Sequence, residues 1–163
     1  MSNFTELLVS AILIDVITLL SLLLSGRGGT YIRKWYIKYH VGAILMDVLS
    51  AFIGAYIALN IGSTLKEQLL AAIFIVLIHD VSFGFIVKAF QNYSPIMNLF
   101  ADYAKEVGGT ILIVDSLIVM GTVLGTKIFE KIENKDKVKF LGVILSYILL
   151  LLVFSFKTIK SEN

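Results

Sequence analysis

Five long runs of apolar residues, separated by short polar gaps, are the dominant pattern of the chain. A helix of about 20 apolar residues spans a hydrocarbon core roughly 30 Å thick. Because backbone polar groups find no water in lipid, a spanning segment has to satisfy them within itself, as a helix does. The pattern therefore predicts an all-α integral membrane helical bundle of about five transmembrane helices, at Leu7–Ser25, Val41–Ile61, Leu69–Phe90, Val107–Phe129 and Phe140–Phe156.

Two of the polar gaps have a pattern of their own. In residues 91–106, Pro95 suits the first turn of a helix, and apolar side chains then recur at helical spacing (Ile96, Leu99, Phe100 and Tyr103). We expect a short amphipathic interfacial helix at about 95–106, lying on the membrane surface. Residues 26–40 combine four Lys/Arg residues with one tryptophan and three tyrosines. This mixture is typical of the headgroup region, and we interpret the segment as an interface anchor.

Composition agrees with a membrane protein and excludes several other classes. Hydrophobic residues make up 58% of the chain and charged residues 16%, whereas about a quarter of a soluble domain is charged. The absence of cysteine excludes disulfides, thiolate metal sites and a thiol nucleophile. A net charge of +2 without a basic tract gives no indication of nucleic-acid binding. We expect residues 1–163 to form a single transmembrane domain with the lipid bilayer as its main surrounding and no cofactor.

Each of the first four predicted spans carries one aspartate near its middle. The four stretches are ILID, ILMD, LIHD and LIVD, ending at Asp15, Asp47, Asp80 and Asp115. A charged residue at the centre of a spanning helix costs about 2.5–3.5 kcal/mol, so such residues normally face the bundle interior and find partners there. We therefore expect the first four spans to form a bundle with the acids turned inward. The fifth span has no acid and is expected at the periphery, facing lipid.

Buried acids with few cations nearby are the parts of a proton relay or a cation site. His79 is the intramembrane side chain whose unperturbed pKa lies near neutrality, so it is the predicted proton shuttle or gate. Because side chains of adjacent residues point in different directions, we expect His79 and Asp80 to bond to other helices rather than to each other. Hydroxyl groups near the acids are the predicted supporting residues: Thr18, Ser50, Ser82, Ser116 and Thr122.

Two functions are compatible with these residues. One is a proton or cation channel or transporter, and the other is a structural or assembly protein of a membrane, with its acids acting as glue between helices. A homo-oligomer suits the first function, because four helices rarely enclose a wide pore. An enzyme is not expected, since protease, phosphate-loop and dinucleotide patterns are absent. Carboxylates and an imidazole can bind a divalent metal cation, but no spacing demands it, and we assign no metal ligand.

The region from about residue 75 to 120 resembles a family of small multi-span membrane proteins encoded by large DNA viruses of eukaryotes. An apolar span with a His-Asp pair, a surface segment with a "P…N…F..YA.E.G" pattern and a span with an aspartate follow one another in both. The matching residues are His79, Asp80, Phe83, Pro95, Asn98, Phe100, Tyr103, Ala104, Glu106, Gly108 and Asp115. The resemblance implies a virion or host-cell membrane and no particular chemistry. It also implies that Tyr103 and Glu106 touch the ends of the third and fourth spans.

Overall fold

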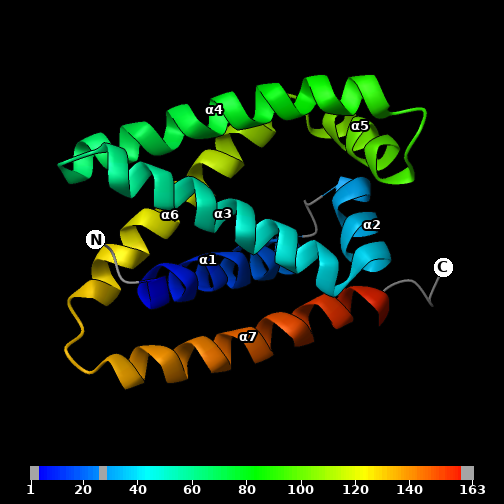
Figure 1. Cartoon of the computed structure of the whole chain (residues 1–163). Coiled ribbons are helices and arrows are strands. Elements are labelled where there is room, and N and C mark those ends of the chain that lie inside the picture. Colours follow the sequence, from blue (N-terminus) through cyan, green and yellow to red (C-terminus); the bar gives the residue numbers. More distant parts are fainter. Residues whose placement is uncertain (1–3, 26–28, 159–163) are drawn as a thin grey trace.

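The computed structural model describes residues 4–25 and 29–158, and this part of the chain folds into seven α-helices without a strand (Figure 1). The helices are α1 (Phe4–Ser25), α2 (Gly29–Tyr39), α3 (Val41–Ile61), α4 (Leu65–Phe90), α5 (Pro95–Val107), α6 (Thr110–Glu130) and α7 (Lys135–Thr158). Five of them, α1, α3, α4, α6 and α7, are long and apolar enough to cross a membrane. The predicted all-α class with five spans is confirmed, and these helices indicate an integral membrane protein.

Local capping explains where two spans differ from their predicted bounds. Helix α4 begins at Leu65, four residues earlier than expected, because Thr64 and Glu67 form a capping box, each side chain accepting a hydrogen bond from the backbone N–H of the other. The helix predicted at 95–106 is confirmed as α5, but it extends to Val107. Gly108 ends it with a φ of 55°, which a glycine adopts at little cost. The fourth span therefore starts at Thr110.

Helix α2 lies in the segment that we interpreted only as an interface anchor. Its aromatic residues Trp35 and Tyr36 are each 3% exposed, so for these two side chains that interpretation is wrong. The sequence does contain the signal for this helix, because Ile32, Trp35, Tyr36 and Tyr39 recur at the spacing of one helix face. The basic residues between these positions also suit a headgroup interface, and this obscured the helical spacing. The chain then breaks at His40, whose φ of 43° separates α2 from α3.

Four of the long helices form a ring, in which α1 packs on α3 and α6, and α4 packs on the same two helices. At one end of the bundle α2 and α5 pack against each other, and we call this the α2/α5 end (Figure 1). The α3–α4 connection and the α6–α7 loop lie at the opposite end, which we call the hairpin end. Helix α7 lies outside the ring against α1. Its outer residues Phe140, Val143 and Tyr147 are exposed, so the peripheral position expected for the fifth span is confirmed.

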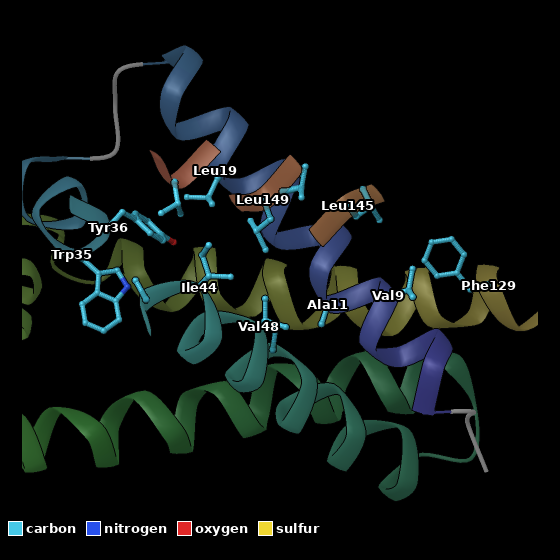
Figure 2. Close-up of a cluster of buried hydrophobic side chains, with 14 of the residues drawn as sticks. Val9, Ala11, Leu19, Trp35, Tyr36, Ile44, Val48, Phe129, Leu145 and Leu149 are labelled. Carbon is cyan, nitrogen blue, oxygen red and sulfur yellow. The ribbon is translucent and has the colours of Figure 1, made fainter. Parts of the chain in front are cut away.

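The larger of the two buried clusters lies where α1, α2, α3 and α7 meet (Figure 2). Leu19 of α1, Ile44 of α3 and Leu149 of α7 are buried there beside Trp35 and Tyr36. Lipid tails are as apolar as these side chains, so close packing rather than escape from water holds helices together in a bilayer. The cluster therefore fixes α2 against the bundle by the shape of its two aromatic rings.

The seam between α1 and α6 is built from small residues. The Ser10 hydroxyl donates a 2.7 Å hydrogen bond to the backbone oxygen of Thr122. A side chain added at Gly125 would collide with Ser10, and one added at Gly121 would press on Ile14. Gly121 and Gly125 form a G-x-x-x-G motif, whose missing side chains allow two helix backbones to approach closely. This motif is a sequence signal that the aspartate pattern overshadowed.

Candidate functional site

All four predicted aspartates lie in the half of the bundle nearer the α2/α5 end. Asp47 and Asp115 are in the second turn of α3 and α6, roughly 8–9 Å from the helix start. The prediction of a mid-span position is wrong for these two, because both helices begin only after a short helix has ended. Asp15 and Asp80 lie about ten residues from the ends of α1 and α4, or roughly 15 Å. The acids thus form a layer below the two short helices.

Asp47 is held by the two aromatic residues that α2 turns inward. The Tyr36 hydroxyl donates a 2.6 Å hydrogen bond to Oδ2 of Asp47, and Trp35 Nε1 approaches the same oxygen at 3.4 Å. Burial, followed by the charges of Asp47 and Asp15, raises the pKa of the Tyr36 hydroxyl well above its usual value. Tyr36 therefore remains a hydroxyl that can donate to Asp47, and it lies within electrostatic reach of Asp15 as well.

Tyr103 of α5 occupies a comparable place on the other side of the site. Burial and then the neighbouring carboxyl groups of Asp115, Asp47, Glu106 and Asp80 raise its pKa to about 12. The hydroxyl thus faces acids from three long helices, α3, α4 and α6. Tyr36 also feels the charge of Tyr103. Two tyrosines therefore stand among the four aspartates, which the aspartate pattern alone did not indicate.

Asp15 is the most deeply buried of the four acids. Its residue is 4% exposed, and among the described residues its Oδ2 has no hydrogen-bond partner. A buried acceptor without a partner lowers stability by about 1–3 kcal/mol. This carboxyl oxygen therefore contributes no hydrogen bond that would hold the helices together.

His79 and Asp80 bond to each other, contrary to the prediction that adjacent residues would not. His79 Nδ1 lies 2.9 Å from Oδ1 of Asp80. The Asp80 side chain is 11% exposed and points toward the bundle, whereas that of His79 is 59% exposed on the outer face of α4. Flexible χ angles bring the two groups together from one helix. The pair connects the outside of the bundle with its interior.

A row of aromatic rings runs from His79 to the two short helices. The His79 ring stacks on Phe83 at 6.0 Å between centroids, and Phe83 meets Phe100 of α5 edge-on at 5.1 Å. Phe100 in turn contacts Trp35 of α2 at 4.8 Å. Phe83 and Phe100 thus join α4 to α5, whereas the contact of Tyr103 with the ends of the third and fourth spans that the resemblance implied stays a prediction.

The predicted supporting hydroxyls do not surround the acids. Thr18 donates to the Ile14 backbone oxygen of its own helix, and Ser50 and Ser82 are exposed. Thr122 is fully buried and donates to Ile118, so it belongs to the α1–α6 seam. Ser116 is half-buried, and among the described residues it makes no side-chain hydrogen bond to an acid. Spacing along one helix could not show which of its neighbours each hydroxyl would meet.

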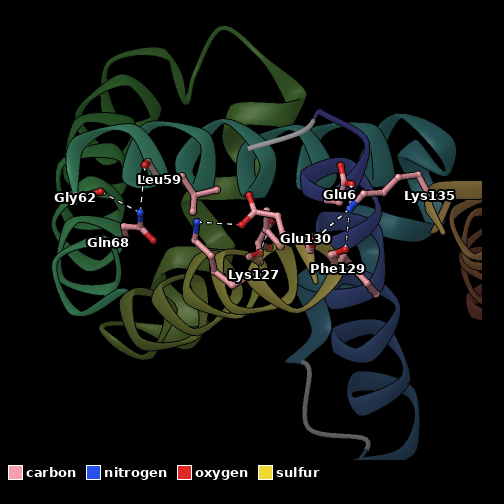
Figure 3. Close-up of polar contacts among 10 residues, drawn as sticks. Glu6, Leu59, Gly62, Gln68, Lys127, Phe129, Glu130 and Lys135 are labelled. Atoms are coloured by element: carbon pink, nitrogen blue, oxygen red, sulfur yellow. Dashed lines mark hydrogen bonds and ion pairs between the residues drawn. The ribbon is translucent and has the colours of Figure 1, made fainter. Parts of the chain in front are cut away.

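Beyond Asp15, buried polar groups continue along the α1–α6 seam toward the hairpin end. They are Ser10, Thr122, Thr126 and Glu6, each at most 1% exposed. At the hairpin end Glu6 forms an ion pair with Lys135 of α7, with 2.8 Å between Oε1 and Nζ (Figure 3). Lys135 also donates to the backbone oxygen of Glu130. A polar strip thus crosses the part of the bundle that the aspartates do not reach.

Glu106 closes the α2/α5 end. Its two carboxylate oxygens accept hydrogen bonds from the backbone N–H groups of Thr30 and Tyr31, at 2.7 and 2.9 Å, in the first turn of α2. First-turn N–H groups have no partner within the helix, so a carboxylate is a good cap. Its hydrogen bonds go to α2, and the expectation that Glu106 touches the ends of the third and fourth spans stays a prediction. Glu106 fastens α2 to α5 over the acid layer.

We expect Glu106→Ala to loosen this fastening. The two backbone hydrogen bonds lower the pKa of Glu106, so they stabilise the folded state above the unfolded pKa and are lost as the pH falls through the lowered folded pKa. Hydrogen–deuterium exchange at Thr30 and Tyr31 should be faster in the variant at neutral pH, and the wild type should approach it in acid. Glu133→Ala, in the exposed α6–α7 loop, is the control. Equal protection at neutral pH in wild type and Glu106→Ala would contradict the role.

The fold and the acid layer define a multi-pass helical membrane protein with a carboxyl–tyrosine site near one end of its bundle. Within residues 4–25 and 29–158, no three His, Cys, Asp or Glu side chains lie together in a way that could hold a metal ion. No protein-family model, curated protein or solved structure matches the chain.

Proposed function

We propose that this membrane protein binds and conducts protons through the acid layer. The observation that carries the proposal is the gathering of carboxyl groups from four different spans around two tyrosine hydroxyls, those of the buried Tyr36 and the half-buried Tyr103. Acidic residues inside membrane helices are costly and commonly serve proton or ion pathways. A proton suits this layer better than a divalent cation, since among the described residues no three acidic or histidine side chains come together to hold a metal ion.

The proposed route has two parts. The His79 imidazole takes up a proton at the outer face of α4 and passes it to Asp80, 2.9 Å away. From Asp80 the proton moves among Asp115, Asp47 and Asp15, with Tyr103 and Tyr36 as hydroxyl links between them. The polar strip of Ser10, Thr122, Thr126 and Glu6 leads on toward the hairpin end. Lys135, paired with Glu6, closes that end of the route.

Proton flux into liposomes tests the proposal directly. Purified protein in vesicles with an internal pH-sensitive dye should dissipate an imposed pH gradient. Asp80→Asn should slow the flux at least tenfold, because an amide cannot pass a proton on, and His79→Ala should slow it and change its pH dependence. Asp136→Asn, in the exposed first turn of α7, should leave it unchanged. Wild-type vesicles as tight as empty ones would overturn the proposal, and unimpaired flux in both variants would remove these residues from the route.

A structural or assembly role is the second candidate, favoured by the outward His79. An imidazole that is 59% exposed on a spanning helix has to find a polar partner or tolerate lipid. A protein partner or a second copy of the chain on this face of α4 would satisfy it. Under this hypothesis His79→Ala weakens an assembly in mild detergent, measured by light scattering, and leaves vesicles proton-tight. The viral or host-cell membrane setting implied by the resemblance stays a prediction.

A further inference from the structure

The order of the helices repeats within the chain. A long helix with an acid, a short helix and a long helix with an acid in its second turn follow one another as α1, α2 and α3. The same order returns as α4, α5 and α6, with Asp80 and Asp115 in the places of Asp15 and Asp47. Helices α3 and α6 are both 21 residues long. Helix α7 stands outside this pattern.

The two breaks between short and long helix agree in sequence and in backbone conformation. Residues 36–47 read YIKYHVGAILMD and residues 103–115 read YAKEVGGTILIVD. Both contain Tyr-x-Lys, Val-Gly, Ile-Leu and the acid in this order, although the second segment is one residue longer and its Val-Gly lies one residue earlier. His40 has φ 43° and ψ −117°, and Gly108 has φ 55° and ψ −139°. Such angles are uncommon for a residue other than glycine. A residue with these angles separates the short from the long helix in both places, before Val41-Gly42 in the first and at the glycine of Val107-Gly108 in the second.

The buried faces of the two 21-residue helices also coincide. A shift by the 68 residues between Asp47 and Asp115 relates four buried positions of α3 to four buried positions of α6. These are Ala51, Gly54, Ala55 and Ala58 in α3, and Val119, Thr122, Val123 and Thr126 in α6. For α1 and α4, the corresponding shift is the 65 residues that separate Asp15 from Asp80. It relates the buried Leu7 and Ala11 of α1 to the buried Ala72 and Val76 of α4.

The packing of the ring has the symmetry that two such units require. Helix α1 packs on α3 and α6, and α4 packs on α6 and α3, while the equivalent helices α2 and α5, and α3 and α6, meet each other. A twofold axis running along the bundle between α3 and α6 produces this arrangement. Membrane proteins built from parallel repeats have their axis along the membrane normal, and their sites lie at the interface of the repeats.

We propose that helices α1–α3 and helices α4–α6 are two copies of one three-helix unit, and that Tyr103 with Asp115 is the second copy of the hydrogen-bonded pair Tyr36–Asp47. Each copy then contributes one tyrosine–aspartate half-site that binds one proton, with Asp15 or Asp80 as the acid beneath it. The proposal deepens the proton-conducting function proposed above and rests on it for the role of the half-sites.

The surroundings of the two tyrosines agree with this equivalence. After burial, the groups that act on Tyr36 are first Asp47 and Asp15 of its own unit and then Tyr103 of the other unit. Among the acids that act on Tyr103, Asp115 comes first, followed by Asp47 of the other unit, Glu106 and last Asp80. The first acid is therefore the equivalent one for both tyrosines. The two units differ in their hydrogen bonding, since Tyr36 donates to Asp47 at 2.6 Å. Among the described residues no hydrogen bond joins Tyr103 to Asp115, and the proposal is that this bond forms when the protonation of the site changes.

Infrared spectroscopy of the full chain in lipid tests the half-sites without requiring conduction. The bands of Asp47 and Asp115 are identified as those lost in Asp47→Asn and Asp115→Asn while a pH titration is followed. We expect Tyr36→Phe to shift the Asp47 band and Tyr103→Phe to shift the Asp115 band, because each phenylalanine removes one hydroxyl donor. Tyr147→Phe, exposed on α7 outside both units, should shift neither.

The outcomes separate this inference from the proposed function. An Asp115 band that stays in place in Tyr103→Phe at every pH, while Tyr36→Phe shifts the Asp47 band, would overturn the equivalence even if the vesicles conduct protons. Both bands shifting in vesicles that do not conduct would support two half-sites and overturn proton conduction instead. If conduction is present, Tyr36→Phe and Tyr103→Phe should each slow it by a similar factor, and a large effect of only one would contradict equivalent half-sites.

Discussion

Gly125→Leu should leave little folded protein in detergent, because it forces α1 and α6 apart. Even a first side-chain carbon at Gly125 would collide with the Ser10 side chain, and leucine adds three more carbons. Moving Ser10 aside also breaks its hydrogen bond to the Thr122 backbone oxygen, worth about 1 kcal/mol. Overpacking of a close-packed interface costs about 1–3 kcal/mol and occasionally more. We expect the free energy of unfolding to fall by about 3 kcal/mol or more.

Gly84→Leu is the matched control for this substitution. Gly84 also lies inside a long helix, α4, but an added side-chain carbon there meets no atom within 4 Å. Both variants gain the same helix propensity from replacing glycine, about 1 kcal/mol, so their difference reports the α1–α6 seam alone. The measurement is unfolding in mixed micelles followed by circular dichroism, together with the yield of monodisperse protein. Equal stability of the two variants would show that α1 and α6 do not approach as closely as the structure has them.

Asp15→Leu should make the protein more stable and abolish proton flux. Asp15 is 4% exposed and its Oδ2 has no partner among the described residues. An insertion scale places aspartate about 3 kcal/mol above leucine at a helix centre, and a buried acceptor without a partner costs about 1–3 kcal/mol. Part of this gain is lost because leucine is larger than aspartate in a packed site. We expect an increase of about 1–2 kcal/mol in the free energy of unfolding.

Asp15→Asn separates charge from shape in this experiment. Asparagine keeps the size and polarity of the side chain, so it should give none of the stability gain of leucine, yet it should also abolish the flux because an amide carries no exchangeable acid proton. The result distinguishes the two candidate functions. A decrease of 1 kcal/mol or more in the stability of Asp15→Leu would mean that Asp15 acts as glue between helices, as in the structural hypothesis.

The same contrast between stability and function can be drawn for other residues of the site. Asp47 has two donors from α2 in the structure, so it contributes to holding that helix as well as to any proton pathway. Asp15 has no such bond to lose. Substitution of a buried polar residue that has no partner among the described residues therefore separates the effect on the free energy of unfolding most clearly from the effect on proton flux.

Several parts of the fold could be predicted from local patterns because lipid imposes them. Each span needs an apolar run of a fixed length, which the sequence shows directly, and Thr64 and Glu67 carry a capping signal that sharpens the start of α4. The amphipathic spacing of α5 was readable for the same reason. Helix α2 was missed because its basic residues and its aromatic residues both suit a headgroup interface, and only packing decides that Trp35 and Tyr36 turn inward.

By itself, the sequence determined the class of the protein, the number of its spans, the four acids and the histidine among them. These features follow from hydropathy and from the cost of charge in lipid, which act on each helix separately. Only the tertiary structure decided that Tyr36 and Tyr103 join the acids, that His79 bonds to Asp80 and that Glu106 caps α2. Those contacts join helices that lie far apart in the chain, or depend on side-chain rotamers that neighbouring helices select, and neither is encoded in the periodicity of a single span.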